Sequence, residues 1–180
     1  KIPDRIKITM NLASCMEDAS IVVLAVPAAA VRQVSEEVAV YASKDQILCV
    51  VSKGIEPKTN MFMSEILYEA TENENICMIS GPSFAIEIAN DSKTGFNVAS
   101  KNIKAAQIVK EQFENGLVVS TCDDIIGVQV AASIKNVFAI FMGIFLFQFL
   151  HSRQKTDFYF SMPVKRSSLF WCKYLQGIVY

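Results

Sequence analysis

The stretch that decides the fold is Ile21-Val22-Val23-Leu24-Ala25-Val26, a short apolar run that Pro27 ends. Its β-branched residues and its lack of polar alternation are typical of a strand that is buried on both faces of a parallel sheet. Apolar residues then recur at helical spacing as far as Tyr41, and similar runs follow at 47–51 and 76–79. This strand–helix–strand alternation with short connections predicts an α/β fold with a doubly wound parallel sheet.

The pattern continues after the third run. We expect two more strands at 94–99 and 117–120 and one long helix at 123–150, with Asp123 or Asp124 as its N-cap. The apolar segment 137–150 is shorter than the ~20 residues that a membrane span needs, and this favours a buried helix. Further helices are expected at 63–70, 82–89 and 103–113.

The charge is distributed unevenly along the chain. The net charge of −1 gives no argument for a nucleic-acid partner. Residues 1–150 hold twelve Lys and Arg against seventeen Asp and Glu, a balance of −5, whereas residues 151–180 hold five against one, a balance of +4. This reversal indicates two segments under different constraints, and we expect the aromatic-rich tail 151–180 not to pack on the α/β core.

Cysteine and histidine usage limits the chemistry. The five cysteines are odd in number and form no C-x-x-C pair, which indicates buried thiols in a reducing cytoplasm and no metal site. The one histidine is His151. Serine–histidine and cysteine–histidine catalysis are therefore excluded in residues 1–150, where an acid or base must be Lys, Asp, Glu, Tyr or Cys.

Polar or small residues follow each of the three strands, where ligands of parallel sheets bind. Pro27 and its small neighbours would let a flat ligand approach the backbone, or they simply begin a helix. Lys53, before the flexible Gly54, points into the ligand crevice or is a solvated turn lysine. Gly81 and Ser83 flank a proline at a helix start, whose free N–H groups hold a phosphate or are merely capped.

Lys135 lies in the long helix, four and eight residues after Ala131 and Gly127, on one narrow small-residue face. A partly buried lysine loses hydration, and this favours the neutral amine that a general base needs. Asn136 could orient a substrate hydroxyl. The alternative is a lysine whose ammonium group reaches water from an apolar helix.

The polar clusters together resemble those of bacterial-type NAD(P)-dependent glycerol-3-phosphate dehydrogenases over roughly residues 3–140. The resemblance implies that Lys135 accepts the proton of the C2 hydroxyl and that Asn136 contacts the substrate. It also implies substrate contacts at Lys53, Gly81 and Ser83 and cofactor contacts at Pro27, Lys53 and Ala85. The matching stretches are 21–27, 51–56, 80–85, 100–102, 124–128 and 135–136.

The resemblance implies a Rossmann-like fold and a site for NAD or NADP. The reaction would interconvert sn-glycerol 3-phosphate and dihydroxyacetone phosphate and supply glycerophospholipid precursors. The division would be a partial NAD(P)-binding domain at 1–122, a helix opening the substrate domain at 123–150, and a tail at 151–180. The binding partners would be these two small molecules. The resemblance is also compatible with a homo-oligomer.

The family's Gly-rich pyrophosphate turn would precede Lys1, and its helical substrate domain would continue after about residue 143. We therefore expect the isolated chain to be inactive. Residues 158–180 resemble the start of a bacterial ABC-transporter permease, which suggests a joined reading frame near 137–147 and membrane contact of the tail. Two alternatives follow, a membrane-associated permease fragment and a non-catalytic Rossmann-like binding module.

Overall fold

The computed structural model describes residues 6–81, 95–113 and 117–153. The chain forms two compact units, Lys1–Ser133 and Ile134–Tyr180. The helix predicted at 82–89 lies outside the described residues, as does the tail from 154 onward.

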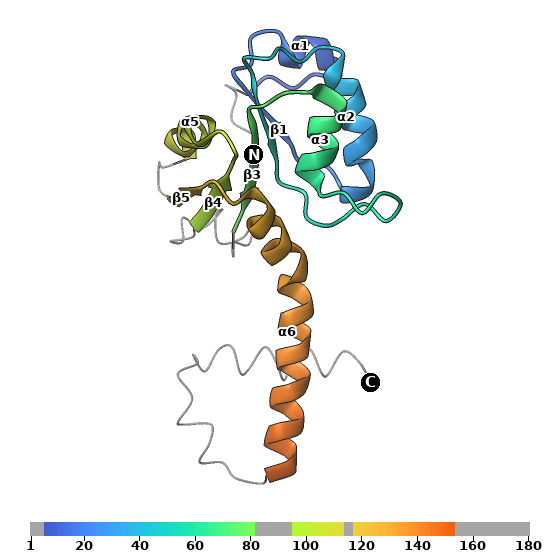
Figure 1. Ribbon diagram of the computed structural model, residues 1–180, viewed down its shortest axis with the longest axis vertical. Helices are drawn as coiled ribbons and strands as arrows, with labels where there is room; N and C mark the ends of the chain where they lie inside the picture. Colours follow the sequence, from blue (N-terminus) through green and yellow to red (C-terminus); the bar gives the residue numbers. More distant parts are fainter. Residues whose placement is uncertain (1–5, 82–94, 114–116, 154–180) are drawn as a thin grey trace. The chain divides into compact units, whose positions relative to one another are not determined.

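Five strands form one sheet in the first unit, in the spatial order β1-β2-β3-β4-β5 (Figure 1). The first three are parallel to one another, and β5 is parallel to β4. The strands are β1 (Ile21–Leu24), β2 (Ile47–Val50), β3 (Ile76–Ser80), β4 (Gly95–Ala99) and β5 (Val118–Cys122). The α/β class and the Rossmann-like, largely parallel sheet predicted from the sequence are confirmed.

The direction of β4 differs from the prediction, because this strand runs antiparallel to β3, with Ser80 opposite Asn97. An antiparallel strand can begin at the edge where its neighbour ended, whereas a parallel one requires the chain to cross the sheet first. The composition of 94–99 predicts a strand but does not encode its direction. The sheet is therefore mixed.

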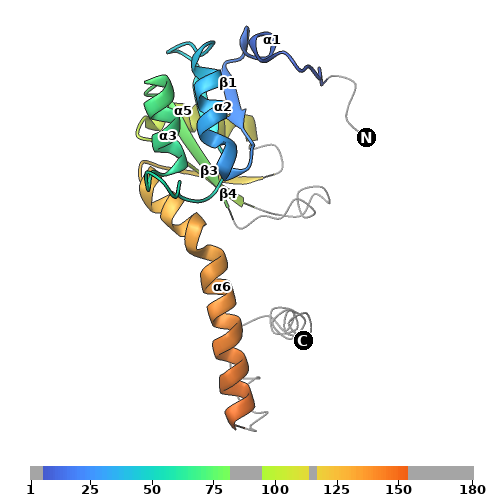
Figure 2. The ribbon, with the colours of Figure 1, turned by 90° about the vertical axis from the view of Figure 1, so that its right-hand side faces the viewer.

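Helices cover both faces of the sheet. Helices α2 (Val31–Ala39) and α3 (Met63–Thr71) lie on one face, and α5 (Ile103–Phe113) lies on the other (Figures 1 and 2). A short helix α1 (Leu12–Met16) precedes β1, and a 3₁₀ turn η1 (Ala28–Ala30) precedes α2. Each face has its own apolar core, centred on side chains such as Leu67 and Met78 on the α2–α3 face and Val109 on the other.

The last helix, α6, spans Ile125–Arg153 and begins in the first unit. The Asp124 carboxylate accepts a hydrogen bond of 2.8 Å from the Gly127 N–H, which confirms Asp124 as the N-cap. Within the described ranges, no single helix is long and apolar enough to cross a membrane. The segments Ile125–Lys135 and Val137–Phe147 meet the length and hydropathy requirement only when they are taken together.

The predicted burial holds for some segments and fails for others. Cys49 and Cys77 are buried opposite each other on β2 and β3, and the hydrogen bond between them, with burial, raises the pKa of the Cys49 thiol. Cys15 is exposed. The helix expected to be buried at 137–150 instead exposes most of its described apolar side chains. Hydropathy predicts which residues prefer burial but does not provide the surface that would bury them.

Candidate functional site

The carboxyl ends of the first three strands lie in register. Leu24 of β1 pairs with Val50 of β2, which pairs with Met78 of β3. Each of these residues is followed, three positions later in the sequence, by a predicted site residue: Pro27, Lys53 and Gly81 respectively. The structure therefore brings these three predicted site residues to one edge of the sheet.

Hydrogen bonds join the ends of β1 and β2. The Ser52 hydroxyl donates to the Val26 carbonyl, and the Val51 N–H donates to the Leu24 carbonyl at 3.2 Å. Gly54 has a φ of +133°, a conformation that L side chains rarely adopt. A Cβ added at Gly54 would lie 3.7 Å from the Ala28 Cβ, at ordinary van der Waals distance. The loop that carries Lys53 thus lies against the turn that follows Pro27.

Lys53 and Pro27 are both exposed at this edge. Gly81 is partly buried, and an added Cβ there would lie only 2.2 Å from the Gly95 carbonyl oxygen. Only glycine allows the chain to leave β3 this close to β4. Ser83 and Ala85, which the sequence places just beyond, lie outside the described residues.

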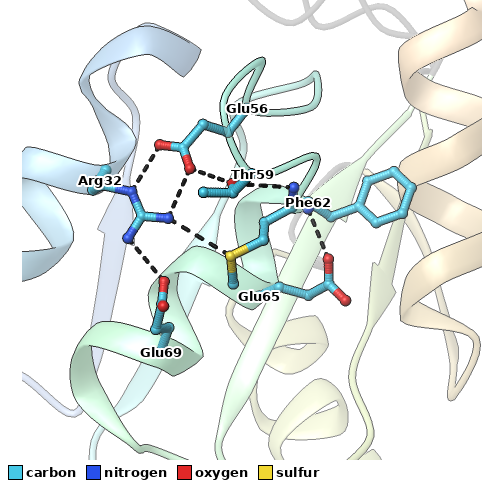
Figure 3. A network of polar contacts seen from close by, with 7 residues as sticks. Arg32, Glu56, Thr59, Phe62, Glu65 and Glu69 are labelled. Atoms are coloured by element: carbon cyan, nitrogen blue, oxygen red, sulfur yellow. Dashed lines mark hydrogen bonds and ion pairs between the residues drawn. The ribbon is translucent and has the colours of Figure 1, made fainter.

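A network around Arg32 holds the loop after β2, and sequence reasoning missed it. The Arg32 guanidinium donates from Nε to Glu56 Oε1 at 2.8 Å and from Nη2 to Glu56 Oε2 at 2.7 Å (Figure 3). Its Nη1 donates to Glu69 Oε2 on α3, also at 2.8 Å. The bonds from Arg32 and from Thr59 lower the pKa of Glu56 to about 2, and the bonds to Glu56 and Glu69 raise the pKa of Arg32.

The sequence carried a signal for this network. Arg32 comes two residues after the small residues that follow Pro27, and Glu56 ends the run Ser52-Lys53-Gly54-Ile55-Glu56. Opposite charges that flank two neighbouring strand ends are candidates for a pair, but the third partner, Glu69, depends on the packing of α3 on α2.

An open cavity of about 640 Å³ adjoins the network, between the start of α2 and the loop after β2. Arg32 and Lys58 contribute positive charge to its lining, and Glu36 and Glu56 contribute negative charge. Among the described residues, no group of three or more His, Cys, Asp or Glu side chains could hold a metal ion.

The other predicted lysine, Lys135, lies on α6 in the second unit and is partly buried. The helix confirms that Gly127, Ala131 and Lys135 share one face, as their spacing predicts. Asn136 is part of the same helix. The residues that the structure groups with one another are those of the first unit, so the roles of Lys135 and Asn136 stay predictions.

A buried polar contact anchors the start of α6 within the first unit. Gln129 Oε1 accepts a hydrogen bond from the Ser64 N–H at 3.0 Å, and its Nε2 donates to Ser64 Oγ at 2.8 Å. Both residues are buried, so two hydrogen bonds fix α6 against the first turn of α3.

Comparisons with known proteins identify relatives of this chain. Residues 1–106 match the family described as NAD-dependent glycerol-3-phosphate dehydrogenase N-terminus. A glycerol-3-phosphate dehydrogenase [NAD(P)+] of Listeria innocua is 39% identical over 147 residues, which cover 79% of this chain and 44% of the relative. One from a Thermoanaerobacter species is 37% identical over 144 residues, 79% of this chain and 43% of the relative.

Solved structures agree with these sequence matches. The crystal structure of glycerol-3-phosphate dehydrogenase from Coxiella burnetii superposes with a TM-score of 0.72 at 26% identity, covering 79% of this chain and 44% of that one. The chain thus spans less than half the length of the curated relatives it matches. The matches give no support to the permease resemblance of residues 158–180.

Proposed function

The chain belongs to the family of NAD-dependent glycerol-3-phosphate dehydrogenases, and we propose that it supplies part of the site that interconverts sn-glycerol 3-phosphate and dihydroxyacetone phosphate. The observation that carries this proposal is the alignment of Pro27, Lys53 and Gly81 at one edge of the sheet. Ligands of α/β sheets bind outside the carboxyl ends of parallel strands. These three residues therefore lie where a phosphorylated substrate and a dinucleotide would meet.

The residues of this edge fit a nicotinamide cofactor. The small side chains after Pro27 permit a flat ring to approach the backbone, and the lack of a Cβ at Gly81 lets the end of β3 lie directly against the β4 backbone. Pro27, Lys53 and Ala85 would hold NAD or NADP. When bound, the nicotinamide supplies the acceptor for the hydride that leaves C2 of the substrate.

The protein's own residues would bind the substrate and move the proton. Lys53 provides a cation for the substrate phosphate, with Gly81 and Ser83 beside it. Asn136 orients the C2 hydroxyl, and Lys135 accepts its proton as the alcohol becomes a ketone. Residues 1–150 contain no histidine to take this role, and the family resemblance assigns it to Lys135.

The proposed reaction supplies a small-molecule precursor of glycerophospholipids. The free cysteines among the described residues support a cytoplasmic site of action. The division into a partial nucleotide domain at 1–122, the helix at 123–150 and the tail at 151–180 is part of the same proposal.

A hybrid enzyme tests the proposal. Residues of this chain replace the matching 147-residue stretch of the Listeria innocua relative. Oxidation of NADH in the presence of dihydroxyacetone phosphate is then followed by absorbance. We expect turnover by the hybrid. A folded hybrid without turnover would contradict the proposal, and one that also binds no nucleotide would favour the non-catalytic binding module.

The role of Lys135 is tested in the same hybrid. Lys135→Ala should lower turnover roughly 10²–10⁴-fold, the usual contribution of a general base. Lys104→Ala, which removes an exposed lysine on α5, is the matched control and should have little effect. Near-normal turnover of Lys135→Ala would remove Lys135 from the proposed mechanism.

A further inference from the structure

Arg32 makes three hydrogen bonds to carboxylates that the proposed chemistry does not use. Two go to the same carboxylate, that of Glu56, in the parallel two-bond geometry that a guanidinium makes with a carboxylate. The third goes to Glu69 on α3. Arg32 stands on the first turn of α2, so one side chain connects two helices to the loop after β2 (Figure 3).

Glu56 is fixed through both its side chain and its backbone. Its carboxylate also accepts a hydrogen bond from the Thr59 hydroxyl. Its N–H donates to the Met61 carbonyl at 2.9 Å, and its carbonyl accepts from the Asn60 N–H at 2.8 Å. The hydrogen bonds of Glu56 therefore hold the loop 56–61 in a closed turn, with the Arg32–Glu56 pair at its centre.

Lys53 lies between two anchors of this segment. On one side, the Ser52 hydroxyl donates to the Val26 carbonyl at the end of β1. On the other side is Glu56, three residues after Lys53. Gly54, with its φ of +133°, lies between the two anchors, so the bonds of Glu56 limit how far the backbone beyond Lys53 can move.

We propose that Arg32 is a positioning residue, which holds the segment Ser52-Lys53-Gly54-Ile55-Glu56 through Glu56 and so fixes Lys53 at the carboxyl end of β2. This inference rests on the proposed function, because Lys53 matters as a ligand-binding cation only if a phosphorylated ligand binds there. The recognition is geometric as well as electrostatic. A lysine at position 32 would keep the charge but could not make the paired bonds to one carboxylate.

Hydrogen exchange in the 180-residue chain tests the structural half of the inference without any ligand. In Arg32→Leu, the amides of Glu56 and Asn60 should exchange roughly tenfold to hundredfold faster, the scale expected for losing a hydrogen-bonded charge pair. The amide of Cys49, in the buried strand β2, should not change. Unchanged exchange at Glu56 and Asn60 would overturn the inference.

Three further variants separate geometry from charge. Arg32→Lys should lose most of the protection that Arg32→Leu loses. Glu69→Gln removes only the α3 arm and should retain most of it, because the paired bonds to Glu56 remain. Lys44→Met is the matched control, since Lys44 is another cation bonded to the end of α3, through the carbonyls of Thr71 and Glu72. It should leave the loop unaffected.

The hybrid enzyme tests the functional half. Arg32→Leu should raise the Michaelis constant for dihydroxyacetone phosphate roughly tenfold or more, with a smaller change in the unfolding midpoint than a core variant shows. Arg32→Lys should not restore the constant. An unchanged Michaelis constant for dihydroxyacetone phosphate in an active Arg32→Leu hybrid would overturn the positioning role alone. A hybrid that keeps Arg32 and shows no turnover would overturn the proposed function. Hydrogen exchange would then decide by itself whether Arg32 fixes the loop.

Discussion

The two units of the molecule handle apolar side chains in opposite ways. In the first unit, Leu67 and Met78 are completely buried, at 0% exposure, between the sheet and its helices. In the described part of the second unit, Phe138 and Ile140 are 59% and 64% exposed. Both regions are rich in apolar residues, but among the described residues it is the first unit that buries them in a core of its own.

The arrangement of polar residues explains this difference. In α2 and α3, charged residues such as Arg32 and Glu69 occupy one side and apolar residues the other, so each helix has a face for the sheet and a face for water. From Val137 to Phe147 the sequence has no charged residue and only one glycine. A helix that is apolar on every side needs apolar neighbours on every side, so apolar content alone does not define a core.

The largest predicted effect tests this contrast directly. Leu67→Ala removes a fully buried side chain and should lower the free energy of unfolding by about 2–5 kcal/mol. Phe141→Ala removes a larger but exposed side chain, whose ring stacks on Phe145, and should change the free energy of unfolding by less than about 0.5 kcal/mol. Urea unfolding followed by circular dichroism measures both. Equal losses would show that the second unit buries Phe141 in solution.

Two glycines, Gly81 in the first unit and Gly143 in the second, provide a second test of this contrast. Gly81→Ala places a Cβ against the Gly95 carbonyl oxygen and should cost about 1–3 kcal/mol, because two backbone segments must separate. An added Cβ at Gly143, in α6, meets nothing within 4 Å. Gly143→Ala should therefore stabilise its helix by up to about 1 kcal/mol. Helix content and unfolding midpoints distinguish the outcomes, and a neutral Gly81→Ala would contradict the close approach of β3 and β4.

The acid response of the first unit gives a third, smaller effect, because the Arg32–Glu56 pair is partly exposed. The folded state lowers the pKa of Glu56 from 4.5 to about 2. The pair therefore contributes stability that is complete above about pH 4.5 and is lost as the pH falls through about 2. Carboxyl-carbon NMR should show Glu56 titrating near pH 2, and near its ordinary value in Arg32→Leu. An ordinary titration in the parent chain would mean that the pair does not persist in solution.

Local sequence signals predicted the strands and helices of the first unit because each element has a clear period. The run at 21–26 is buried and β-branched, and the helix predicted at 103–113 has those same bounds in the structure. The sequence also predicted an N-cap at Asp123 or Asp124, because a short acidic side chain before an apolar run marks a helix start. What these signals could not give was the direction of β4, which depends on how the chain returns to the sheet.

The candidate site was predicted in part for a similar reason. Pro27, Lys53 and Gly81 each follow a strand, and parallel strands bring their carboxyl ends together. The bonds of Arg32 to Glu69 and of Gln129 to Ser64 join residues 37 and 65 positions apart. Contacts of this kind depend on the packing of whole helices, and no local period encodes them.

The smallest predicted effect concerns a polar group inside the well-packed unit. The Ser35 hydroxyl is buried on α2, and the described residues supply no hydrogen-bond partner for it. Ser35→Ala should therefore raise the free energy of unfolding by about 1 kcal/mol, because it removes an unsatisfied polar group and favours the helix. Ser64→Ala is the matched control, since the Ser64 hydroxyl, also on a buried residue, accepts a bond from Gln129 and its loss should destabilise the protein. If Ser35→Ala were destabilising instead, the Ser35 hydroxyl must form a hydrogen bond in solution, for example to a buried water.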